Sequence, residues 1–271
     1  MPARKPPPVT KPAGGEKAAP GRAAKGRTIQ NKTVKAGARL AKPLVARIDT
    51  TPEPVDPATL ATIFSRLRDA NPEPRAELHY INAYTLLVAV VLSAQATDKG
   101  VNIATTPLFA IADTPQKMLD LGEERVRHAI RTIGLFNTKA KNVIALSRIL
   151  VERHGGVVPR TAEELEVLPG VGAKTASVVL NVAFGVPRIA VDTHIFRVAN
   201  RIPLVVAATT DKVQAGLERI VPEPFLLNAH HWLILFGRYV CKARRPECPR
   251  CPIADLCRYP SKTVTPLSAG A

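Results

Sequence analysis

The chain has 271 residues, of which 46% are hydrophobic, and it carries a formal net charge of +16 at pH 7. This hydrophobic content can bury a substantial core and excludes a chain that is disordered throughout. No apolar run approaches the ~20 residues that a membrane-spanning helix needs, and the positive charge favours a polyanionic partner. Because the N-terminus lacks the apolar core of a secretory signal, we infer a cytosolic, reducing compartment.

The first 48 residues differ in composition from the rest of the chain. They are rich in proline, alanine and glycine, and they contain 12 lysines and arginines but only one acidic residue, Glu16. Such a segment cannot bury enough apolar surface to order itself, so we predict a disordered basic arm over residues 1–53, and a flexible tail over 263–271. Nonspecific phosphate binding and a purely solubilising role are both compatible with the arm.

The folded part is predicted to begin as a series of helices. Asp56 and Pro57 are typical of a helix start, and the apolar residues that follow at helical spacing end before Asn71 and Pro72. The apolar run Tyr84–Leu92 is long enough for a buried helix, although periodicity alone does not distinguish that helix from a strand. The residues of the first helix that are expected to point inward are Leu60, Ile63, Phe64 and Leu67.

Start and stop signals predict further helices in the middle of the chain. One begins at Pro115, a second is expected over Glu123–Thr132, and a third over Thr138–His154 before two glycines. No stretch shows sustained alternation of apolar and polar residues with hairpin turns. The predicted fold class is therefore all-α.

A polar cluster, LSAQATD (Leu92–Asp98), ends the apolar run abruptly. Placing Ser93, Gln95 and Asp98 beside a core is costly unless these residues face a cleft, which favours a binding site at this position. The alternative is an ordinary helix end, in which Thr97 caps the next helix.

The segment LPGVGAKTASVVLNVAF (168–184) contributes to two helices joined by a tight hairpin. Thr161 and Glu164 form a capping-box pair that opens the first helix, and Gly170 and Gly172 interrupt the chain before the second. Without Cβ atoms these glycines let the backbone turn tightly and approach a ligand, and the new helix start offers unpaired N–H groups that suit a phosphate. A plain helical hairpin without a ligand is the alternative.

Lys174 and Asp192 are the candidate catalytic residues. Lys174 lies in the first turn of the second helix, where the macrodipole disfavours a positive charge, and an unprotonated amine is a nucleophile. The helix ends near Gly185, and the loop after it is long enough to return Asp192 to Lys174. The alternatives are a solvated surface lysine and an N-cap at Asp192 for a helix over Thr193–Arg201, and the cap is compatible with catalysis.

All four cysteines lie in one C-terminal stretch with the spacing C-x6-C-x2-C-x5-C. Two disulfides are disfavoured in a reducing compartment, so four thiolate ligands of a metal site are the stronger interpretation. Spacing and ligand type leave zinc and iron–sulfur open. We interpret the basic residues in this loop as phosphate contacts. The candidate ligands are Cys241, Cys248, Cys251 and Cys257, and the basic residues are Lys242, Arg244, Arg245 and Arg250.

The motifs LPGVGAKTA and VDTHIFRV resemble those of the helix-hairpin-helix DNA glycosylase superfamily, and the pair of Lys174 and Asp192 resembles its endonuclease III branch. The resemblance covers most of the chain after the basic arm. It implies two helical domains with a DNA-binding cleft between them. One is a helical-barrel domain over 76–186 that carries the helix-hairpin-helix motif, and the other is an iron–sulfur domain formed by 54–75 and 187–262.

The resemblance also implies an activity, that of a bifunctional DNA glycosylase and abasic-site lyase that removes oxidised pyrimidines from double-stranded DNA. Lys174 would form a Schiff base with deoxyribose once the base has been flipped out, and β-elimination would cut the strand 3′ to the lesion. Asp192 would stabilise positive charge on the sugar. A [4Fe-4S] cluster is implied for the four cysteines, and we expect a monomer that acts in the cytoplasm, at the nucleoid.

The way in which DNA is held is likewise implied by the resemblance. Gln95 matches a residue that fills the gap left in the duplex, and Leu135 matches a hydrophobic wedge against the orphaned opposite base. Backbone groups of the hairpin are expected to hold a phosphate, namely those of Leu168, Gly170, Val171 and Gly172.

Two other functions are weighed against this one. An adenine-mismatch glycosylase of the same superfamily has no lysine at the position of Lys174 and carries a catalytic glutamate before the pocket loop, whereas no glutamate occurs between Tyr84 and Gln95. A noncatalytic DNA-binding iron–sulfur protein would bind damaged and intact DNA equally. The presence of both Lys174 and Asp192 disfavours that function.

Overall fold

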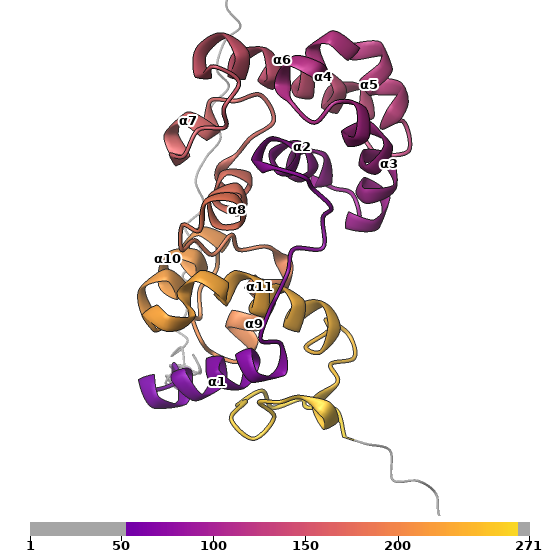
Figure 1. The fold of residues 1–271 in the computed structure, drawn as a ribbon. Helices are drawn as coiled ribbons and strands as arrows, with labels where there is room; N and C mark the ends of the chain where they lie inside the picture. Colours follow the sequence, from indigo (N-terminus) through magenta and orange to yellow (C-terminus); the bar gives the residue numbers. More distant parts are fainter. Residues whose placement is uncertain (1–52, 265–271) are drawn as a thin grey trace, which may run out of the picture. The chain divides into compact units, whose positions relative to one another are not determined.

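The computed structural model describes residues 53–264, and these residues are helical without a strand among them (Figure 1). The predicted all-α fold class is confirmed. The basic arm predicted over residues 1–53, apart from its last residue, and most of the tail predicted over 263–271 lie outside the described residues. Within the described part of the chain, no helix is both long and apolar enough to cross a membrane.

The helices divide between two hydrophobic clusters, which we call the α2–α8 cluster and the α1/α9–α11 cluster. The first contains α2 (Ala83–Ser93), α3 (Asp98–Ile111), α4 (Pro115–Leu121), α5 (Glu123–Ala129), α6 (Phe136–His154), α7 (Ala162–Glu166) and α8 (Ala173–Phe184). The second contains α1 (Pro57–Ala70), α9 (Thr193–Arg201), α10 (Thr210–Ile220) and α11 (Glu223–Tyr239), and the short 3-10 helix η1 (Cys248–Arg250) follows in the cysteine loop.

Helix α2 lies at the centre of the α2–α8 cluster. Every residue from Tyr84 to Leu92 is buried, and α3, α6 and α8 pack against the helix. At its start, the Asn82 side chain accepts from the N–H of Thr85 and the Thr85 hydroxyl accepts from the N–H of Asn82, which completes a capping box. The periodicity of this run did not distinguish helix from strand, because a helix buried on all sides has no polar face.

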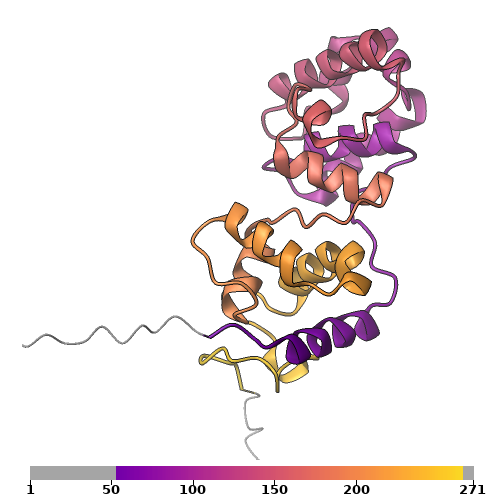
Figure 2. The ribbon, with the colours of Figure 1, turned by 90° about the vertical axis from the view of Figure 1, so that its left-hand side faces the viewer.

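Helix α1 packs against α11 in the α1/α9–α11 cluster, although the two helices are far apart in the sequence (Figures 1 and 2). Asp56 caps α1 by accepting from the N–H groups of Ala58 and Thr59, and the four predicted inward residues are buried. The indole Nε1 of Trp232 donates to the carbonyl of Asn71 at 2.8 Å. The chain therefore leaves this cluster after α1, builds the α2–α8 cluster, and returns with α9.

Three local predictions differ from the structure. The helix predicted over Glu123–Thr132 is shorter, because α5 ends at Ala129. Helix α6 begins at Phe136 rather than at Thr138, since Leu135 adopts a left-handed conformation and turns the chain into the helix. At the start of α7, the Thr161 hydroxyl accepts from the N–H of Glu164 but donates to its carboxylate. The Glu164 side chain thus does not reach back to the Thr161 backbone, and only half of the capping box forms.

Candidate active site and DNA interface

The hairpin between α7 and α8 lies against the core through its glycines. Gly170 has a φ of +82°, and a Cβ atom on it would lie 2.9 Å from Asn142 Nδ2 on α6 and 3.2 Å from Val91 Cγ1 on α2. A side chain there would be strained and would push the hairpin away from α6. Gly172 is the N-cap residue of α8 and provides no side-chain cap, so the first N–H groups of α8 are available to a ligand.

Leu168 and Val171, whose backbone groups were predicted to contact DNA, are packed inside the fold. Their side chains are only 2% and 7% exposed and pack in the α2–α8 cluster. Their N–H groups are used as well, because Leu168 donates to the carbonyl of Leu165 at 3.1 Å and Val171 donates to the carbonyl of Leu168 at 3.0 Å. These two residues anchor the hairpin that presents Gly170 and Gly172, and the DNA contact expected of their backbone groups stays a prediction.

Asp192 is the N-cap residue of α9, one of the two roles that the sequence indicated for it. Its Oδ1 accepts from the N–H of His194 at 2.9 Å and from the N–H of Ile195 at 2.8 Å. These bonds hold a carboxylate at the positive end of a helix in one orientation. Both of them use Oδ1, so the cap leaves Oδ2 for a second role of the same side chain.

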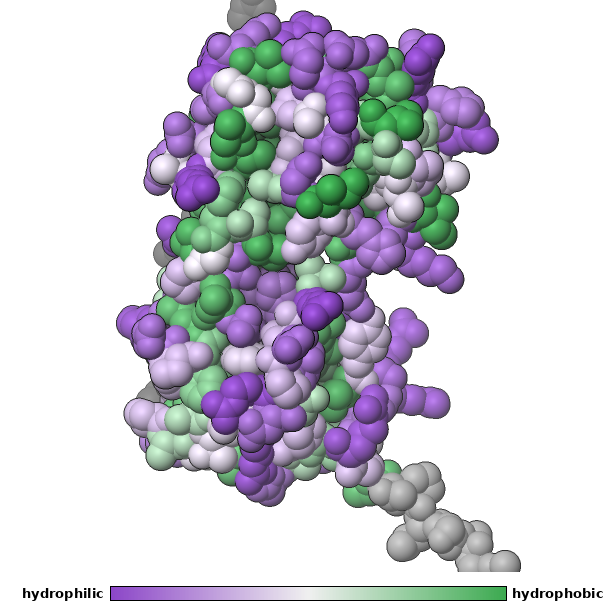
Figure 3. Space-filling model, in the orientation of Figure 1, coloured by the Kyte–Doolittle hydropathy of each residue, from purple (hydrophilic) through white to green (hydrophobic). Residues whose placement is uncertain are grey.

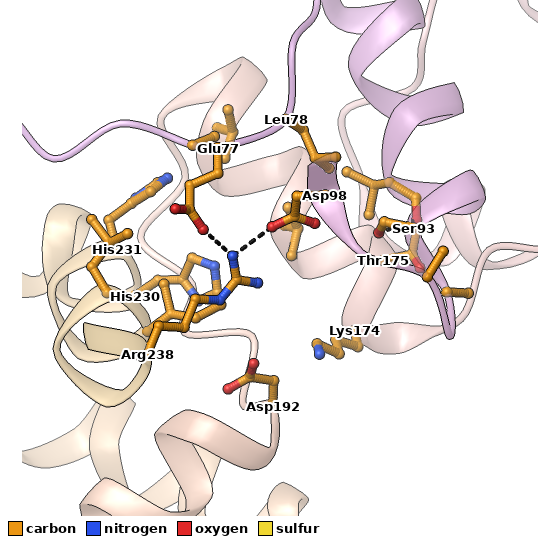
Figure 4. A pocket seen from close by; sticks show the side chains of 18 of the residues that line it. Glu77, Leu78, Ser93, Asp98, Lys174, Thr175, Asp192, His230, His231 and Arg238 are labelled. Carbon is orange, nitrogen blue, oxygen red and sulfur yellow. Dashed lines mark hydrogen bonds and ion pairs between the residues drawn. The ribbon is translucent and has the colours of Figure 1, made fainter. Parts of the chain in front are cut away.

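Lys174 and Asp192 line the same pocket, which has a volume of about 340 Å³ and draws its walls from both hydrophobic clusters. Lys174 is exposed in the first turn of α8, and Figure 4 shows its amine directed into the pocket, on the side where Asp192 lies. Concave sites of this size are typical of small-molecule binding. The structure thus brings together the two residues that the sequence indicated as a catalytic pair.

Charged residues that the sequence analysis did not combine close one wall of the pocket. Arg238 of α11 pairs with Asp98 at 2.5 Å and also with Glu77, and Figure 4 shows the guanidinium between the two carboxylates. Burial by itself would lower the pKa of Arg238, but the bonds to Asp98 and Glu77 outweigh burial and raise the pKa above its usual value. The three residues come from distant parts of the chain, so no local motif indicates that Arg238 pairs with Glu77 and Asp98.

Two adjacent histidines of α11 line the pocket with little exposure to solvent. His230 is 5% exposed and His231 is 9% exposed. Burial, and then the nearby charges of His231, Lys174 and Arg238, lower the pKa of His230 to about 3. Burial also lowers the pKa of His231. Both imidazoles are therefore neutral near pH 7.

We expect the buried histidine pair to make the fold sensitive to acid. Unfolded His230 binds a proton near its ordinary pKa of 6.5, whereas folded His230 binds one only near pH 3, so stability is lost as the pH falls from 6.5 towards 3. Each pKa unit of difference corresponds to ~1.4 kcal/mol. Thermal unfolding between neutral pH and about pH 4.5 measures this loss, which should be smaller in His230→Phe than in the wild type.

The control for this prediction is His79→Phe, which removes an exposed histidine. That variant should lose stability with acid as steeply as the wild type, because it keeps the buried histidine pair. If the stability of His230→Phe and that of the wild type decrease equally steeply as the pH falls, the acid sensitivity has another source.

Gln95 and Leu135 lie in two neighbouring loops. Both have a positive φ, 55° and 60° respectively, which is uncommon for residues other than glycine. Leu135 is apolar and yet 62% exposed, and Gln95 is exposed and also lines the pocket. A Cβ atom on Gly134 would lie 4.0 Å from the carbonyl oxygen of Gln95, so the two loops approach each other closely. The structure thus presents an amide and an apolar side chain from adjacent loops.

The basic residues of the cysteine loop are exposed, and hydrophilic side chains gather around this segment in Figure 3. Lys242 pairs with Glu247, which also pairs with Arg250. This carboxylate reduces the net charge that the two cations offer to DNA. Arg244 and Arg245 form no ion pair with any residue that the structure describes, so they are the stronger candidates for phosphate contacts.

All four cysteines line one cavity, together with Arg201 and Tyr259, and they form no disulfide. Among the residues that the structure describes, no three potential ligands lie close enough to hold a single metal ion. Four thiols that line one cavity are a ligand set that both zinc and an iron–sulfur cluster accept. Burial raises the pKa of the Cys251 thiol to about 11, so its thiolate form depends on the positive charge of a bound metal.

The helical fold, the glycine hairpin beside a charged pocket and the four-cysteine loop define a class of protein, the helix-hairpin-helix proteins of base excision DNA repair. The family model described as HhH-GPD superfamily base excision DNA repair protein matches residues 88–223. A second family model, the iron–sulfur binding domain of endonuclease III, matches residues 241–257 and contains all four cysteines.

The chain is similar to endonuclease III of Haemophilus influenzae, with 56% identity over 200 residues that cover 74% of this chain and 95% of the relative. Endonuclease III of Escherichia coli K12 is 54% identical over 200 residues, which cover 74% of this chain and 95% of that relative. A trapped endonuclease III–DNA covalent intermediate, an estranged-adenine complex, matches with a TM-score of 0.70 and 42% identity over 76% of this chain and 97% of that chain.

The chain belongs to the endonuclease III family. It is a base-excision-repair enzyme that combines DNA glycosylase and abasic-site lyase activities, and it binds DNA. The cysteine loop is the site of a [4Fe-4S] cluster, which settles the choice between zinc and iron–sulfur that the spacing left open.

Proposed function

We propose that Lys174 and Asp192 form the catalytic centre of this glycosylase and lyase. The observation that carries the proposal is that both side chains line one pocket, the amine from the first turn of α8 and the carboxylate from the N-terminus of α9. An exposed amine beside a fixed carboxylate supplies the nucleophile and the charged partner that base removal through a Schiff base requires.

The reaction begins when the damaged nucleotide leaves the duplex and enters the pocket, because C1′ is inaccessible in stacked DNA. The Nζ of Lys174 bonds to C1′ as the bond between C1′ and the base breaks, and the base departs with the bonding electron pair and takes up a proton. The sugar ring opens to give the Schiff base. Loss of a proton from C2′ then expels the 3′ phosphate by β-elimination, and water finally releases Lys174.

Asp192 stabilises the positive charge that develops on the sugar as the base departs. Its Oδ1 is held by two N–H groups, so the carboxylate is oriented before the substrate arrives and requires no reorganisation during the reaction. The same carboxylate accepts and returns the protons that move between Lys174 and the sugar.

DNA is held around the pocket by groups that position it without reading its sequence. The hairpin glycines and the first N–H groups of α8 bind one phosphate. The cations of the cysteine loop, chiefly Arg244 and Arg245, bind others. Gln95 and Leu135 enter the duplex from their adjacent loops and fill the space that the extruded nucleotide leaves, which water fills poorly.

The proposed substrates are oxidised pyrimidines and abasic sites in double-stranded DNA. One chain supplies both Lys174 and Asp192 to the pocket, which supports action as a monomer. We assign the two hydrophobic clusters to two domains, 76–186 and the combination of 54–75 with 187–262, with the DNA cleft between them. The net charge of +16 supports association with the nucleoid.

A panel of duplexes, each with one defined lesion, tests this function. Each duplex is incubated with the protein and analysed for strand cleavage with and without subsequent alkali. Oxidised pyrimidines should be cleaved without alkali, which reports base removal followed by β-elimination, and intact duplexes should remain uncut. Cleavage that appears only after alkali would contradict the lyase step, and equal binding to every duplex without any cleavage would contradict catalysis altogether.

A further inference from the structure

We infer that Lys139 is a positioning residue that holds the loops of Gln95 and Leu135 together, so that the two side chains enter the duplex as a unit. The inference rests on the proposed insertion of Gln95 and Leu135 into DNA. Lys139 lies near the start of α6 and is not itself one of the residues that line the pocket.

The side chain of Lys139 is only 5% exposed and spans from α6 to the end of α2. Its Nζ donates to the carbonyl of Leu92 at 2.9 Å and to the carbonyl of Ala94 at 2.7 Å. Carbonyls at the C-terminal end of a helix lack partners within the helix and carry the negative end of its dipole, so an ammonium group suits them. A buried ammonium is costly without such partners, which restricts Lys139 to this position.

The two bonds act on the backbone of the Gln95 loop. The carbonyl of Ala94 belongs to the peptide unit that joins Ala94 to Gln95, so fixing this oxygen fixes the orientation of the Gln95 backbone. Gln95 has a φ of 55°, a conformation that persists in residues other than glycine only when the surroundings impose it. The bond from Lys139 supplies this constraint.

The backbone of Lys139 acts on the second loop. Its N–H donates to the carbonyl of Leu135 at 3.0 Å, which closes the first turn of α6 on this exposed residue, whose φ of 60° is also positive. One residue therefore binds the Leu135 loop through its main chain and the Gln95 loop through its side chain. Removing the ammonium should leave α6 intact, but the Gln95 loop should no longer be held to α6.

The test compares Lys139→Met with Lys141→Met, which removes an exposed lysine from the same helix. Base removal from a duplex with one oxidised pyrimidine should fall about ten- to hundredfold in Lys139→Met, because misplaced contacts slow extrusion of the base. Cleavage at an abasic site in single-stranded DNA needs no extrusion and should remain close to the wild-type rate. Lys141→Met should match the wild type on both substrates.

A merely structural role of Lys139 is separated from positioning by a double-mutant cycle. The double variant Lys139→Met with Gln95→Ala should be scarcely slower on duplex DNA than Gln95→Ala, because the side chain that Lys139 positions is already absent. The inference would be overturned if the losses of rate in the two single variants added up in the double variant. It would also be overturned if Lys139→Met lost as much rate on single-stranded abasic DNA as on duplex DNA. If Lys139→Met does not fold, Lys139→Arg, which keeps a charged donor, is measured with the same pair of substrates and should show a smaller loss confined to the duplex.

The outcomes for the inference and for the proposed function are distinguishable. If Gln95→Ala and Leu135→Ala both remove bases from duplex DNA at the wild-type rate, insertion itself is contradicted. If these two variants are impaired and Lys139→Met is not, insertion stands and only the role of Lys139 is wrong.

Discussion

Replacing Lys174 with alanine is expected to abolish borohydride trapping of this protein on damaged DNA. The trapped adduct forms by reduction of a Schiff base, and the Schiff base requires an amine in the pocket that also contains Asp192. Strand cleavage without alkali should disappear at the same time, because β-elimination proceeds from the imine. A denaturing gel measures trapping as a band of protein bound covalently to labelled DNA.

Two further variants test whether the nucleophilic amine itself is needed, rather than only its positive charge or any lysine in the first turn of a helix. Lys174→Arg keeps the positive charge, but a guanidinium is always protonated, so DNA affinity should be retained while trapping is lost. Lys212→Ala removes an exposed lysine from the first turn of α10, away from the pocket, and should be trapped like the wild type. A trapped adduct from Lys174→Ala would show that a different amine is the nucleophile.

Replacing Asp192 with asparagine is expected to slow base removal by about two to four orders of magnitude, the range for loss of a positioned acid–base group. Asparagine is as good an N-cap as aspartate, so the bonds to His194 and Ile195 can be kept and the stability of α9 should change little. The variant thus removes the charge while it keeps the cap. Single-turnover glycosylase rates and the Tm measure the two effects separately.

The matched control is Asp56→Asn. Asp56 caps α1 in the same way, with Oδ1 accepting from two N–H groups, but it is exposed and lies outside the pocket. Its replacement should leave the glycosylase rate and the Tm close to the wild-type values. If Asp192→Asn removes bases at the wild-type rate with an unchanged Tm, the carboxylate serves only as a helix cap.

Much of the fold was predictable because its signals are local. The cap at Asp56 bonds to N–H groups two and three residues ahead, so the start of α1 is encoded within a few positions. Asp192 caps α9 in the same way, which the sequence also indicated. The run Tyr84–Leu92 was undecided between helix and strand, because only the neighbours that bury α2 on all sides account for the absence of a polar face.

Residues of the site that depend on distant partners were not predictable. The sequence grouped Leu168 and Val171 with the hairpin glycines, and the structure shows that their side chains and N–H groups are already used inside the fold. Lys139 had no local signal at all, because its partners are carbonyls of another helix end. Backbone carbonyls are present at every residue, so no sequence pattern identifies the ones that a buried lysine will bind.

The sequence by itself determined the all-α class and indicated Lys174, Asp192 and the four cysteines as candidate site residues, since residue type and short-range spacing carry these signals. Only the tertiary structure decided that the amine and the carboxylate share one pocket and that Arg238 closes its wall by pairing with Asp98 and Glu77. The physical reason is that helix caps and periodicity act over a few residues, whereas the pocket is formed by packing two clusters whose members are interleaved along the chain.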